Sequence, residues 1–352
     1  IDSTICRMDA DVKPGINITN YERLHEFDTN RFVGVVLDES SILKNFVGKT
    51  KVALVNAFKN TPYKLSLSGT PAPNDYLELL NQADFLDVME ASKALATWFV
   101  NDMKTGTWRL KGHAVHEFWK WVSTWAVLID KPSDLGYSDD GFILPKHNEI
   151  VEEIEIDLID HEYKDGFIRH VDLSATSFHK EKKLTADVRA KKCGEIAAST
   201  DEQYLVWCDT NQEADLLRKY IPDAVEVRGT DKPDFKEKAS QDFKDGKIRV
   251  LISKPKIFGY GMNFQNCHNA IFCGRTFSYE DYYQAIKRLL RFGQKHEVNS
   301  YTVIGSTEKR ILEIVNDKQQ KQLEMKQSIS NCIKDIQLQN FKGNEVKNTT
   351  EY

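Results

Sequence analysis

Three polar residues late in the chain have the types and spacing that suit the chemistry of phosphate groups. In the stretch 282–294, Gln284, Arg288 and Arg291 lie at positions i, i+4 and i+7, which on a helix fall on one face. The opposite face is apolar and suited to burial. Guanidinium groups keep their charge and match phosphate oxygens in shape, so an arginine pair of this kind could contact a phosphoryl group. The alternative is an amphipathic surface helix with two solvated arginines.

Two neighbouring carboxylates near the start of the chain could hold a cation. Asp38 and Glu39 follow the apolar run 31–37, which is typical of a parallel strand covered on both faces. The carboxyl end of such a strand is where open α/β sheets place their ligands, and two carboxylates there suit Mg²⁺. The alternative is a strand-end Asp that caps the next helix, with Glu39 in its first turn. The segment alone favours neither interpretation.

A phosphate-binding loop would complete this chemistry, but the sequence does not contain one. Gly48-Lys49-Thr50 matches the end of the pattern G-x-x-x-x-G-K-[ST], which requires glycine at position 43, where the chain has Leu43. No other segment fits the pattern. We therefore expect Lys49 to be a solvated helix residue and the phosphate-binding loop to be absent from these 352 residues.

Composition limits the class of protein. A chain of 352 residues with 41% hydrophobic and 29% charged residues is typical of a soluble protein with two domains and has no apolar run of membrane-spanning length. A net charge of −5 excludes a protein that is basic overall, so any nucleic-acid contact must use a local basic surface. The six cysteines show no metal-binding spacing and indicate reduced thiols in a cytoplasm. We expect the chain, which begins at Ile1, to be a piece of a longer polypeptide.

The elements that must position these residues alternate between strands and helices. In the second half the predicted strands are 204–208, 224–227, 248–253, 270–273 and 300–304, and the predicted helices are 212–220, 233–244 and 279–292. Alternation of this kind implies parallel pairing with right-handed crossovers. The strands 31–37 and 64–67 suggest a second, similar lobe that lacks its beginning.

Between the two lobes the pattern changes. Residues 91–144 hold five of the six tryptophans, which we interpret as the core of a helical insertion, the alternative being exposed rings that stack on nucleic acid. Residues 150–159 alternate like an exposed strand, and the basic run 180–192 suits a solvated helix face. Past residue 308 the chain is polar and helical, and we expect the tail to be disordered.

Five blocks of sequence together resemble the superfamily-two helicases, and within them the Swi/Snf-type ATPases. Residues 18–22 resemble motif Ib, 38–45 motif II with its Asp-Glu box and Lys-Asn, and 68–74 motif III. Residues 259–264 are similar to motif V, and 284–294 to motif VI with its Gln-Ala…Arg…Arg-x-Gly-Gln signature. The order and spacing of the blocks, which cover roughly residues 16–315, are more specific than any single block.

The resemblance implies an α/β fold with two RecA-like parallel-sheet lobes, the first N-terminally incomplete. The residues of two short segments, 72–74 and 253–256, are similar to those of the compact phage members of the family. This similarity implies that the protein is found in the cytoplasm of a bacterium or of a phage-infected host cell. The expected organisation is lobe 1 at 1–90, the Trp-rich helical insertion at 91–145, a connecting segment at 146–195, lobe 2 at 196–307, a C-terminal bracing helix at 308–341 and a disordered tail at 342–352.

The resemblance also assigns roles to residues. Asp38 would hold Mg²⁺ through water, Glu39 would orient or deprotonate the attacking water, and Arg288 and Arg291 would reach the γ-phosphate of ATP. The remaining positions carried over from the motifs are Gln284, Gly259 and Gly261 for nucleotide binding, Ser68, Gly69 and Thr70 for coupling hydrolysis to movement, and Thr19, Asn20, Tyr21 and Asn263, with help from Gly261, for the DNA backbone.

The implied activity is an ATP-dependent motor on double-stranded or branched DNA, with ATP and Mg²⁺ as ligands, no membrane partner, a monomeric state and little base specificity. Two departures from the family pattern weaken the inference of this activity. Ser41 stands where the family usually has His, and motif I is missing, so this fragment alone should be inactive while the longer protein hydrolyses ATP. The alternative is a non-catalytic nucleic-acid-binding or regulatory module with a degenerate helicase fold. Strand separation would share every motif, and displacement of a strand from forked DNA distinguishes it.

Overall fold

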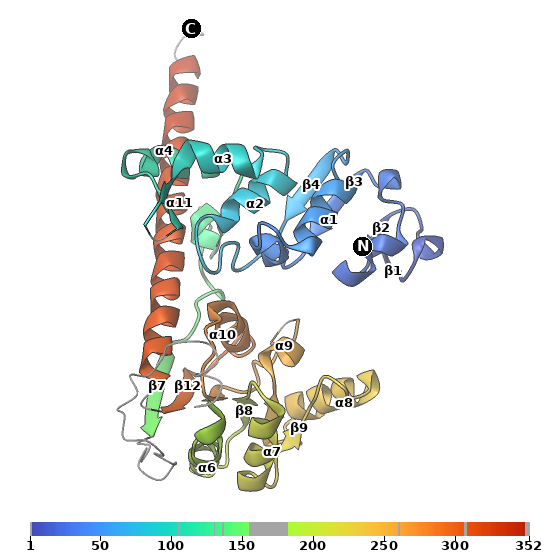
Figure 1. Ribbon diagram of the computed structural model, residues 1–352, viewed down its shortest axis with the longest axis vertical. Helices are drawn as coiled ribbons and strands as arrows, with labels where there is room; N and C mark the ends of the chain where they lie inside the picture. The colour runs from blue at the N-terminus through green and yellow to red at the C-terminus, as the bar shows by residue number, and fades with distance from the viewer. Residues whose placement is uncertain are drawn as a thin grey trace. The chain divides into compact units, whose positions relative to one another are not determined.

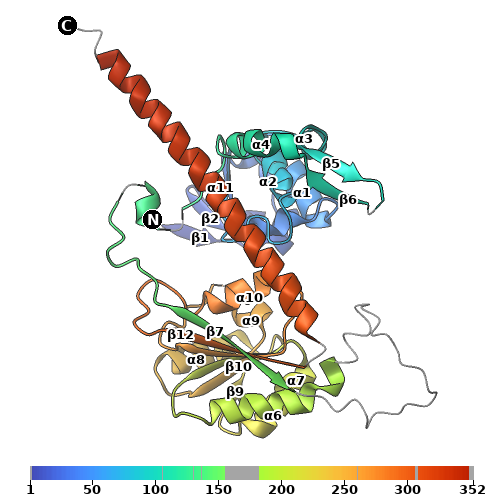
Figure 2. The same cartoon turned by 90° about the vertical axis from the view of Figure 1, so that its left-hand side faces the viewer.

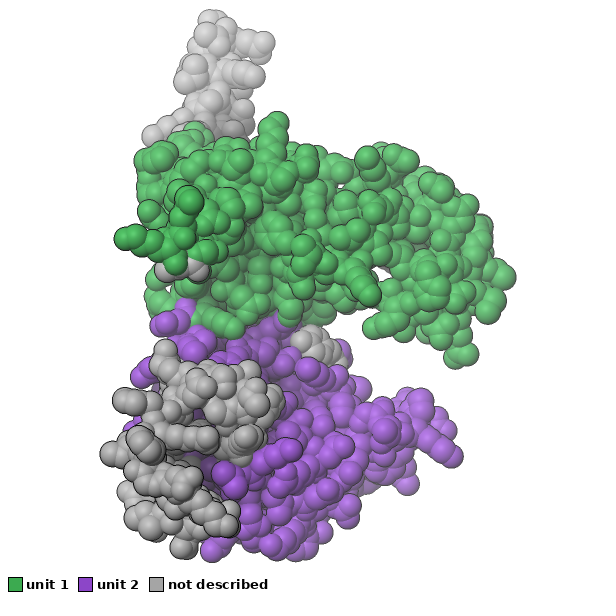
Figure 3. Space-filling model, in the orientation of Figure 1, with its two compact units in different colours: residues 1–128, 318–352 green, residues 129–317 purple. Residues whose placement is uncertain are grey.

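The computed structural model describes residues 2–104, 106–129, 131–135, 137–154, 182–259, 261–305 and 308–348. The chain divides into two compact units: unit 1 comprises residues 1–128 and 318–352, and unit 2 comprises residues 129–317 (Figure 3). Both units contain parallel strands and helices, so the predicted α/β class is confirmed. Within the described residues, none of the helices combines the length and the hydropathy needed to cross a membrane.

Unit 2 is built on a six-stranded sheet in the order β7-β12-β11-β8-β10-β9, with every pair parallel (Figure 2). Parallel sheets are covered by helices on both faces, which explains why the inner strands are buried along their whole length. The strands are β7 (His147–Ile154), β8 (Tyr204–Trp207), β9 (Val225–Glu226), β10 (Val250–Ser253), β11 (Asn269–Cys273) and β12 (Val298–Gly305).

Successive side chains along a strand point to opposite faces of the sheet, so they belong to two separate hydrophobic cores. On β8, Tyr204 and Val206 belong to the core under α6 and α7, while Leu205 and Trp207 belong to the core on the opposite face, under α8, α9 and α10. Figure 2 shows α6 and α10 on opposite sides of the sheet. The helices are α6 (Ala186–Ala197), α7 (Asn211–Tyr220), α8 (Pro233–Lys244), α9 (Pro255–Phe258), α10 (Tyr279–Ile286) and α11 (Lys309–Asn348), whose first residues belong to unit 2.

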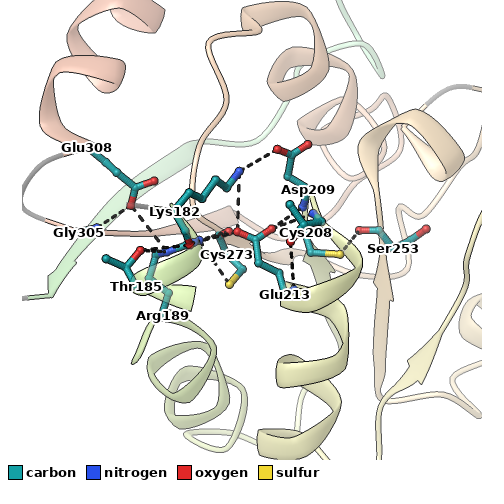
Figure 4. A network of polar contacts seen from close by, with 11 residues as sticks. Lys182, Thr185, Arg189, Cys208, Asp209, Glu213, Ser253, Cys273, Gly305 and Glu308 are labelled. Atoms are coloured by element: carbon teal, nitrogen blue, oxygen red, sulfur yellow. Dashed lines mark hydrogen bonds and ion pairs between the residues drawn. The ribbon is translucent and has the colours of Figure 1, made fainter. Parts of the chain in front are cut away.

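A buried ionic network joins the α6 side of this sheet to the residues that precede α11 (Figure 4). Arg189 of α6 is fully buried and donates from Nη1 to the Cys273 carbonyl oxygen at 2.6 Å, at the end of β11. Its Nη2 lies 2.9 Å from Oε1 of the buried Glu213, and its Nε lies 3.8 Å from Oε2 of the buried Glu308. One guanidinium therefore lies beside two buried carboxylates, and Lys182 Nζ also lies 3.8 Å from Glu213 Oε1.

Each carboxylate of the network also accepts backbone hydrogen bonds. Glu213 closes a capping box at the start of α7, where its Oε2 accepts from the Thr210 N–H at 3.0 Å and its own N–H donates to Thr210 Oγ1. Glu308 Oε2 accepts from the Gly305 N–H at 2.7 Å at the end of β12. Burial raises the pKa of Glu308, and the nearby Arg189 guanidinium opposes that rise. The network thus joins α6, α7, β11 and β12.

Unit 1 holds smaller sheets and a helical region (Figure 1). β3 pairs in parallel with β4, β1 in parallel with β2, and β5 in antiparallel fashion with β6. The strands are β1 (Ser3–Ile5), β2 (Ile16–Ile18), β3 (Gly34–Leu37), β4 (Tyr63–Ser66), β5 (Phe99–Asp102) and β6 (Thr107–Leu110), and the α-helices before α11 are α1 (Lys49–Ala57), α2 (Glu78–Phe85), α3 (Ala91–Trp98) and α4 (Val115–Val122). Short 3₁₀ helices in this unit lie at Asp9–Asp11, Tyr21–Glu26, Thr29–Arg31, Ser40–Lys44 and Gly112–Ala114.

The tryptophan-rich region forms a packed core, as its interpretation as a helical insertion predicts. Phe118 and Trp119 of α4 are buried, and Trp121 lies 5.8 Å from Trp98 and 5.4 Å from Trp125, measured between ring centroids. The later part of α11 completes this core with Met325, Ile329 and Cys332. The antiparallel pair β5–β6 within this region was not predicted from the sequence.

Three elements differ from the sequence-based expectations. The helix expected over 279–292 ends at Ile286. The segment 146–195, expected to be a connector, supplies the edge strand β7 and the packed helix α6 to unit 2, while residues 155–181, which include the end of the predicted strand 150–159, lie outside the described residues. α11 continues to Asn348, beyond the expected helix end at 341, and residues 349–352 of the expected tail also lie outside the described residues.

Replacement of Arg189 tests the buried network. Arg189→Met should lower the free energy of unfolding of unit 2 by about 3–5 kcal/mol, because it leaves Glu308 buried without its ion-pair partner and leaves Glu213 with only Lys182, whose Nζ lies 3.8 Å from Glu213 Oε1. Urea denaturation followed by circular dichroism measures the change. The matched control is Lys219→Met, which removes an exposed ion pair to Asp187 at 3.3 Å and should leave the free energy of unfolding nearly unchanged, because water screens such pairs. An Arg189→Met loss as small as that of the control would contradict this role.

Candidate functional site

The carboxyl ends of β3 and β4 lie together and are joined by backbone hydrogen bonds. The Leu67 N–H donates to the Leu37 carbonyl oxygen at 2.8 Å, and the Ser40 N–H donates to the Leu67 carbonyl oxygen at 2.8 Å. The segment that begins with Asp38 and the segment that begins with Ser68 are therefore neighbours at one end of the strand pair.

Asp38 and Glu39 occupy the strand end itself. Asp38 is exposed, and its Oδ1 accepts a hydrogen bond from the Glu39 N–H at 3.2 Å. Glu39 adopts the left-handed conformation, with φ 52° and ψ 52°, which is uncommon for a residue other than glycine and recurs at functional sites. It stands at the N-cap of the 3₁₀ helix Ser40–Lys44 but makes no side-chain capping bond there. The alternative interpretation placed Glu39 in the first turn of the next helix, whereas the structure places it at the N-cap.

Tyr21 attaches the predicted motif Ib to this strand end. Its hydroxyl donates to the Asp38 carbonyl oxygen at 2.5 Å. Burial, with smaller contributions from Asp38 and Glu39, raises the pKa of Tyr21 to about 12, so the hydroxyl keeps its proton. Tyr21 thus supports the carboxylate pair. The neighbouring Thr19 and Asn20, predicted to touch a DNA backbone, are exposed.

The predicted coupling residues form a tight turn. Ser68 Oγ accepts a hydrogen bond from the Thr70 N–H at 3.1 Å, Gly69 is exposed between them, and Thr70 is buried. Within the described part of the chain the Thr70 Oγ1 atom has no hydrogen-bond partner, which is costly for a buried hydroxyl.

Sequence reasoning missed two amides that hold the segment after Glu39. Gln82 of α2 is buried and donates from Nε2 to the Ser40 carbonyl oxygen at 2.9 Å, and Asn81 donates from Nδ2 to the Lys44 carbonyl oxygen at 3.1 Å. Two adjacent amides in a helix that is otherwise largely apolar are the signal that could have identified them, because buried amides need partners. They fix the 3₁₀ helix that follows the carboxylates.

In unit 2, the predicted motif VI residues gather around one backbone carbonyl. Arg288 is buried, and its Nη1 donates to the Met262 carbonyl oxygen at 2.9 Å. The Nη1 of Arg291 donates to the same oxygen, also at 2.9 Å. Gln284 Oε1 accepts from Arg288 Nη2 at 2.9 Å. The structure thus brings Gln284, Arg288 and Arg291 together with the motif V segment.

The two arginines differ in how fully they are engaged. The Nε of Arg288 donates to the Gln284 carbonyl oxygen at 2.9 Å, so all three nitrogen atoms of its guanidinium make internal hydrogen bonds. Arg291 is only partly buried, and its Nη1 bond to Met262 is its contact with the segment. Arg288 therefore has the environment of a positioning residue, and Arg291 that of a residue that can also reach a ligand.

The glycines of the predicted motif V have conformational reasons for their positions. The Gly259 N–H donates to the Pro255 carbonyl oxygen at 2.6 Å, and a Cβ at Gly259 would collide with that carbonyl group. Gly261 has φ +70°, which favours glycine. Asn263 Oδ1 accepts from the Gln265 N–H at 3.2 Å. None of these contacts tests the predicted ligand roles, and Tyr260 lies outside the described residues.

Comparisons with known proteins identify the class of unit 2. Residues 188–293 match the model of the helicase conserved C-terminal domain. This range contains β8 to β11, the predicted motif V and the three residues around Met262. Within unit 2, residues 188–293 are therefore similar to a helicase C-terminal domain.

Particular relatives match over short segments. The chain is 32% identical over 105 residues to the TATA-binding protein-associated factor MOT1 of Saccharomyces cerevisiae, covering 28% of this chain and 6% of that protein. It is 31% identical over 87 residues to the bifunctional helicase and thymine dioxygenase JBP2 of Leishmania infantum, covering 24% and 8%. The matched segments span less than a tenth of the length of these curated relatives.

A solved structure, the crystal structure of the C-terminal part of the Fun30 ATPase domain, aligns with a TM-score of 0.31 and 23% identity, over 41% of this chain and 45% of that one.

The different environments of the two arginines lead to a stability prediction. Arg288→Met should lower the free energy of unfolding of unit 2 by about 1.5–3 kcal/mol, because it removes hydrogen bonds from a buried charged donor. Arg291→Met is the matched comparison and should cost about 0.5–1 kcal/mol, because Arg288 still satisfies the Met262 carbonyl. Urea denaturation of the two variants measures the difference, and equal losses would show that Arg288 has no special positioning role.

Proposed function

We propose that the chain is part of an ATP-driven motor that hydrolyses ATP and moves on double-stranded DNA without sequence specificity. The single observation that carries this proposal is the match of residues 188–293 to the helicase C-terminal domain, within which Arg288 and Arg291 donate to one carbonyl and Gln284 accepts from Arg288. The printed name of one relative, a bifunctional helicase, supports a helicase-like protein. The similarity to compact phage proteins, and a place in a bacterial or phage-infected cytoplasm, remain predictions from the motifs.

The residues of unit 1 fit a water-coordinated Mg²⁺ and an activated water. Mg²⁺ in ATPases keeps several waters and is held by one or two carboxylates together with substrate phosphates, which suits the exposed Asp38. Glu39 is the proposed group that orients or deprotonates the attacking water. The hydrogen bond from Tyr21 and the backbone links to Leu67 hold the strand end that carries both carboxylates.

The residues of unit 2 fit a role in stabilising phosphate charge. We assign the direct contact with the γ-phosphate to Arg291 first, because Arg288 already uses all three of its nitrogen atoms internally. Arg288, itself held by Gln284, then positions Arg291 through the Met262 carbonyl that the two arginines share. Gly259 and Gly261 let the adjacent segment follow the backbone path that this contact needs.

An uncovered apolar surface on unit 1 supports the proposal that the active protein contains a further segment with the phosphate-binding loop. Val36 of β3 and Tyr63 and Leu65 of β4 are exposed, whereas Leu37 at the end of β3 is buried. The exposed residues are of the type found inside a covered parallel sheet. Additional strands or helices over this surface would bury them and bring the missing loop to the lobe.

Binding to DNA is assigned to exposed polar groups that can contact phosphates. Thr19 and Asn20 of unit 1 are exposed, and Asn263 of unit 2 lies in the predicted motif V. Contacts to phosphate and sugar position a protein on a duplex without reading its sequence. We therefore propose double-stranded or branched DNA as the partner of a monomeric protein, with ATP and Mg²⁺ as its ligands.

One observation favours a second function. The pattern G-x-x-x-x-G-K-[ST] does not occur in these 352 residues, and Gly48 precedes α1 without a strand directly before it. A protein without a phosphate-binding loop anywhere would be a non-catalytic nucleic-acid-binding or regulatory module. The codons upstream of Ile1 distinguish the two functions, because the motor requires a strand, a phosphate-binding loop and a helix there.

The activity test uses a version of the protein extended upstream through such a segment. ATP hydrolysis should be stimulated by double-stranded DNA, and Glu39→Gln should lower turnover about 10²-fold or more, because it removes the group that activates water. Steady-state release of phosphate measures turnover. The matched control is Glu117→Gln, an exposed residue of α4 that should leave turnover unchanged. Equal turnover in the two variants would refute the assignment of Glu39.

A further inference from the structure

A pocket of about 240 Å³ lies in unit 2, at the carboxyl ends of β8, β10 and β11. Ligands of open parallel sheets bind at this edge. The pocket contains neither the carboxylates nor the Gln284–Arg288–Arg291 cluster assigned above. Its lining includes Trp207, Lys254, Lys256, Arg275 and Asp281.

Arg275, which follows β11, is the central charged residue of this pocket. Its side chain is only 3% exposed. Nη2 forms an ion pair with Glu149, Nε donates to Thr302 Oγ1 at 3.4 Å, and the guanidinium carbon lies 3.4 Å from the centroid of the Tyr282 ring. Within the residues that the structure describes, Nη1 is buried and has no hydrogen-bond partner.

A second buried donor belongs to the same lining. Trp207, at the end of β8, is 1% exposed, and its indole Nε1 has no hydrogen-bond partner among the described residues. Leaving one buried donor without a partner costs about 1–3 kcal/mol, and more for a charged group. Two such donors on one pocket indicate that the pocket is completed by a ligand that accepts hydrogen bonds.

The charges around the pocket indicate an anionic ligand. Arg275 is balanced by Glu149, so the charges left in the lining are those of Lys254 and Lys256 against the carboxylates of Asp209 and Asp281. Asp209 is already paired with Lys182 at 3.0 Å. Burial pushes the pKa of Asp209 upward, but Lys182, Lys256 and Lys254 outweigh burial and hold that pKa below its ordinary value. The positive charge of the lining thus acts on whatever occupies the pocket.

We propose that this pocket binds a small free anion of the phosphate class, held by Arg275 and Lys254. The depth of Arg275 favours a free ion over a phosphate of a DNA duplex, because a nearly buried guanidinium is accessible only to a small group. The volume of about 240 Å³ is also below the range of about 300–1,000 Å³ that is typical of sites for larger ligands. The site is independent of ATP hydrolysis and can be tested without it.

The test titrates the 352-residue chain with inorganic phosphate at constant ionic strength, using chloride as the reference ion. Isothermal titration calorimetry and the indole N–H signal of Trp207 in an NMR spectrum report binding, with the signal identified by Trp207→Phe. The expected result is a saturable response to phosphate that chloride does not produce. A response that does not saturate, or that chloride reproduces, would overturn the proposal.

Variants locate the site. Lys254→Met should weaken phosphate binding about tenfold, because it removes a charged hydrogen-bond donor. Lys244→Met, an exposed lysine of α8 outside the lining, should leave binding unchanged. Arg275→Lys keeps a positive charge opposite Glu149 but lacks the Nη1 donor, and it should abolish the Trp207 response. Unchanged binding in Lys254→Met would place the phosphate elsewhere and refute the assignment.

A final arm distinguishes the source of the phosphate group. A short DNA duplex without terminal phosphates should leave the Trp207 signal in place, while inorganic phosphate shifts it. A signal that responds to the duplex and not to inorganic phosphate would show a backbone contact and overturn the free-anion proposal. Because no ATP is present, the outcome does not depend on whether the protein is a motor.

Discussion

The carbonyl oxygen of Met262 is the acceptor on which the organisation of the candidate site in unit 2 depends. It accepts hydrogen bonds from two guanidinium groups, those of Arg288 and Arg291, at equal distances of 2.9 Å. A carbonyl oxygen has two lone pairs, so these bonds satisfy it fully. They tie the segment after α9 to the segment after α10, and any displacement of one segment changes the position of the other. A nucleotide that draws Arg291 away would therefore be sensed by the predicted motif V.

A comparable constraint acts at the strand ends of unit 1. The chain after β3 and the chain after β4 share backbone hydrogen bonds through Leu67, and Tyr21 and Gln82 attach a 3₁₀ helix and α2 to the same place. Backbone bonds of this kind do not depend on side-chain identity. The substitution of Ser for the usual His at position 41 therefore leaves a physical link between the two loops, because the Ser40 N–H and the Leu67 carbonyl group supply one.

Much of unit 2 could be predicted from the sequence because its strands are buried on both faces and alternate with helices. The prediction of a helix over 279–292 was wrong beyond Ile286, although the apolar period continues. In an α-helix the Arg288 N–H would donate to the Gln284 carbonyl, but Arg288 Nε donates there at 2.9 Å and the Arg288 N–H turns to Ala285. The periodic pattern of apolar residues does not reveal that a side chain will take the carbonyl acceptor that the next turn of the helix needs.

The sequence also predicted only part of the candidate site. Motif spacing identified Gln284, Arg288 and Arg291, and the structure brings them together, but no pattern indicated that Met262 would be their common partner, since any residue provides a carbonyl. Arg275 was likewise invisible, because its significance lies in burial beside Tyr282 rather than in spacing. The segment 146–195 was assigned to a connector because β7 has one neighbour and alternates like an exposed strand, as an edge strand does.

The central claim is that Arg291, positioned by Arg288 through the Met262 carbonyl, acts on the phosphate of ATP. The most direct measurement is the DNA-stimulated turnover of Arg291→Ala in the version of the protein that contains a phosphate-binding loop. We expect a loss of about 10³-fold or more, as for an arginine that stabilises transferring phosphate, with a nearly unchanged unfolding transition. Turnover equal to that of the unmodified protein would contradict it.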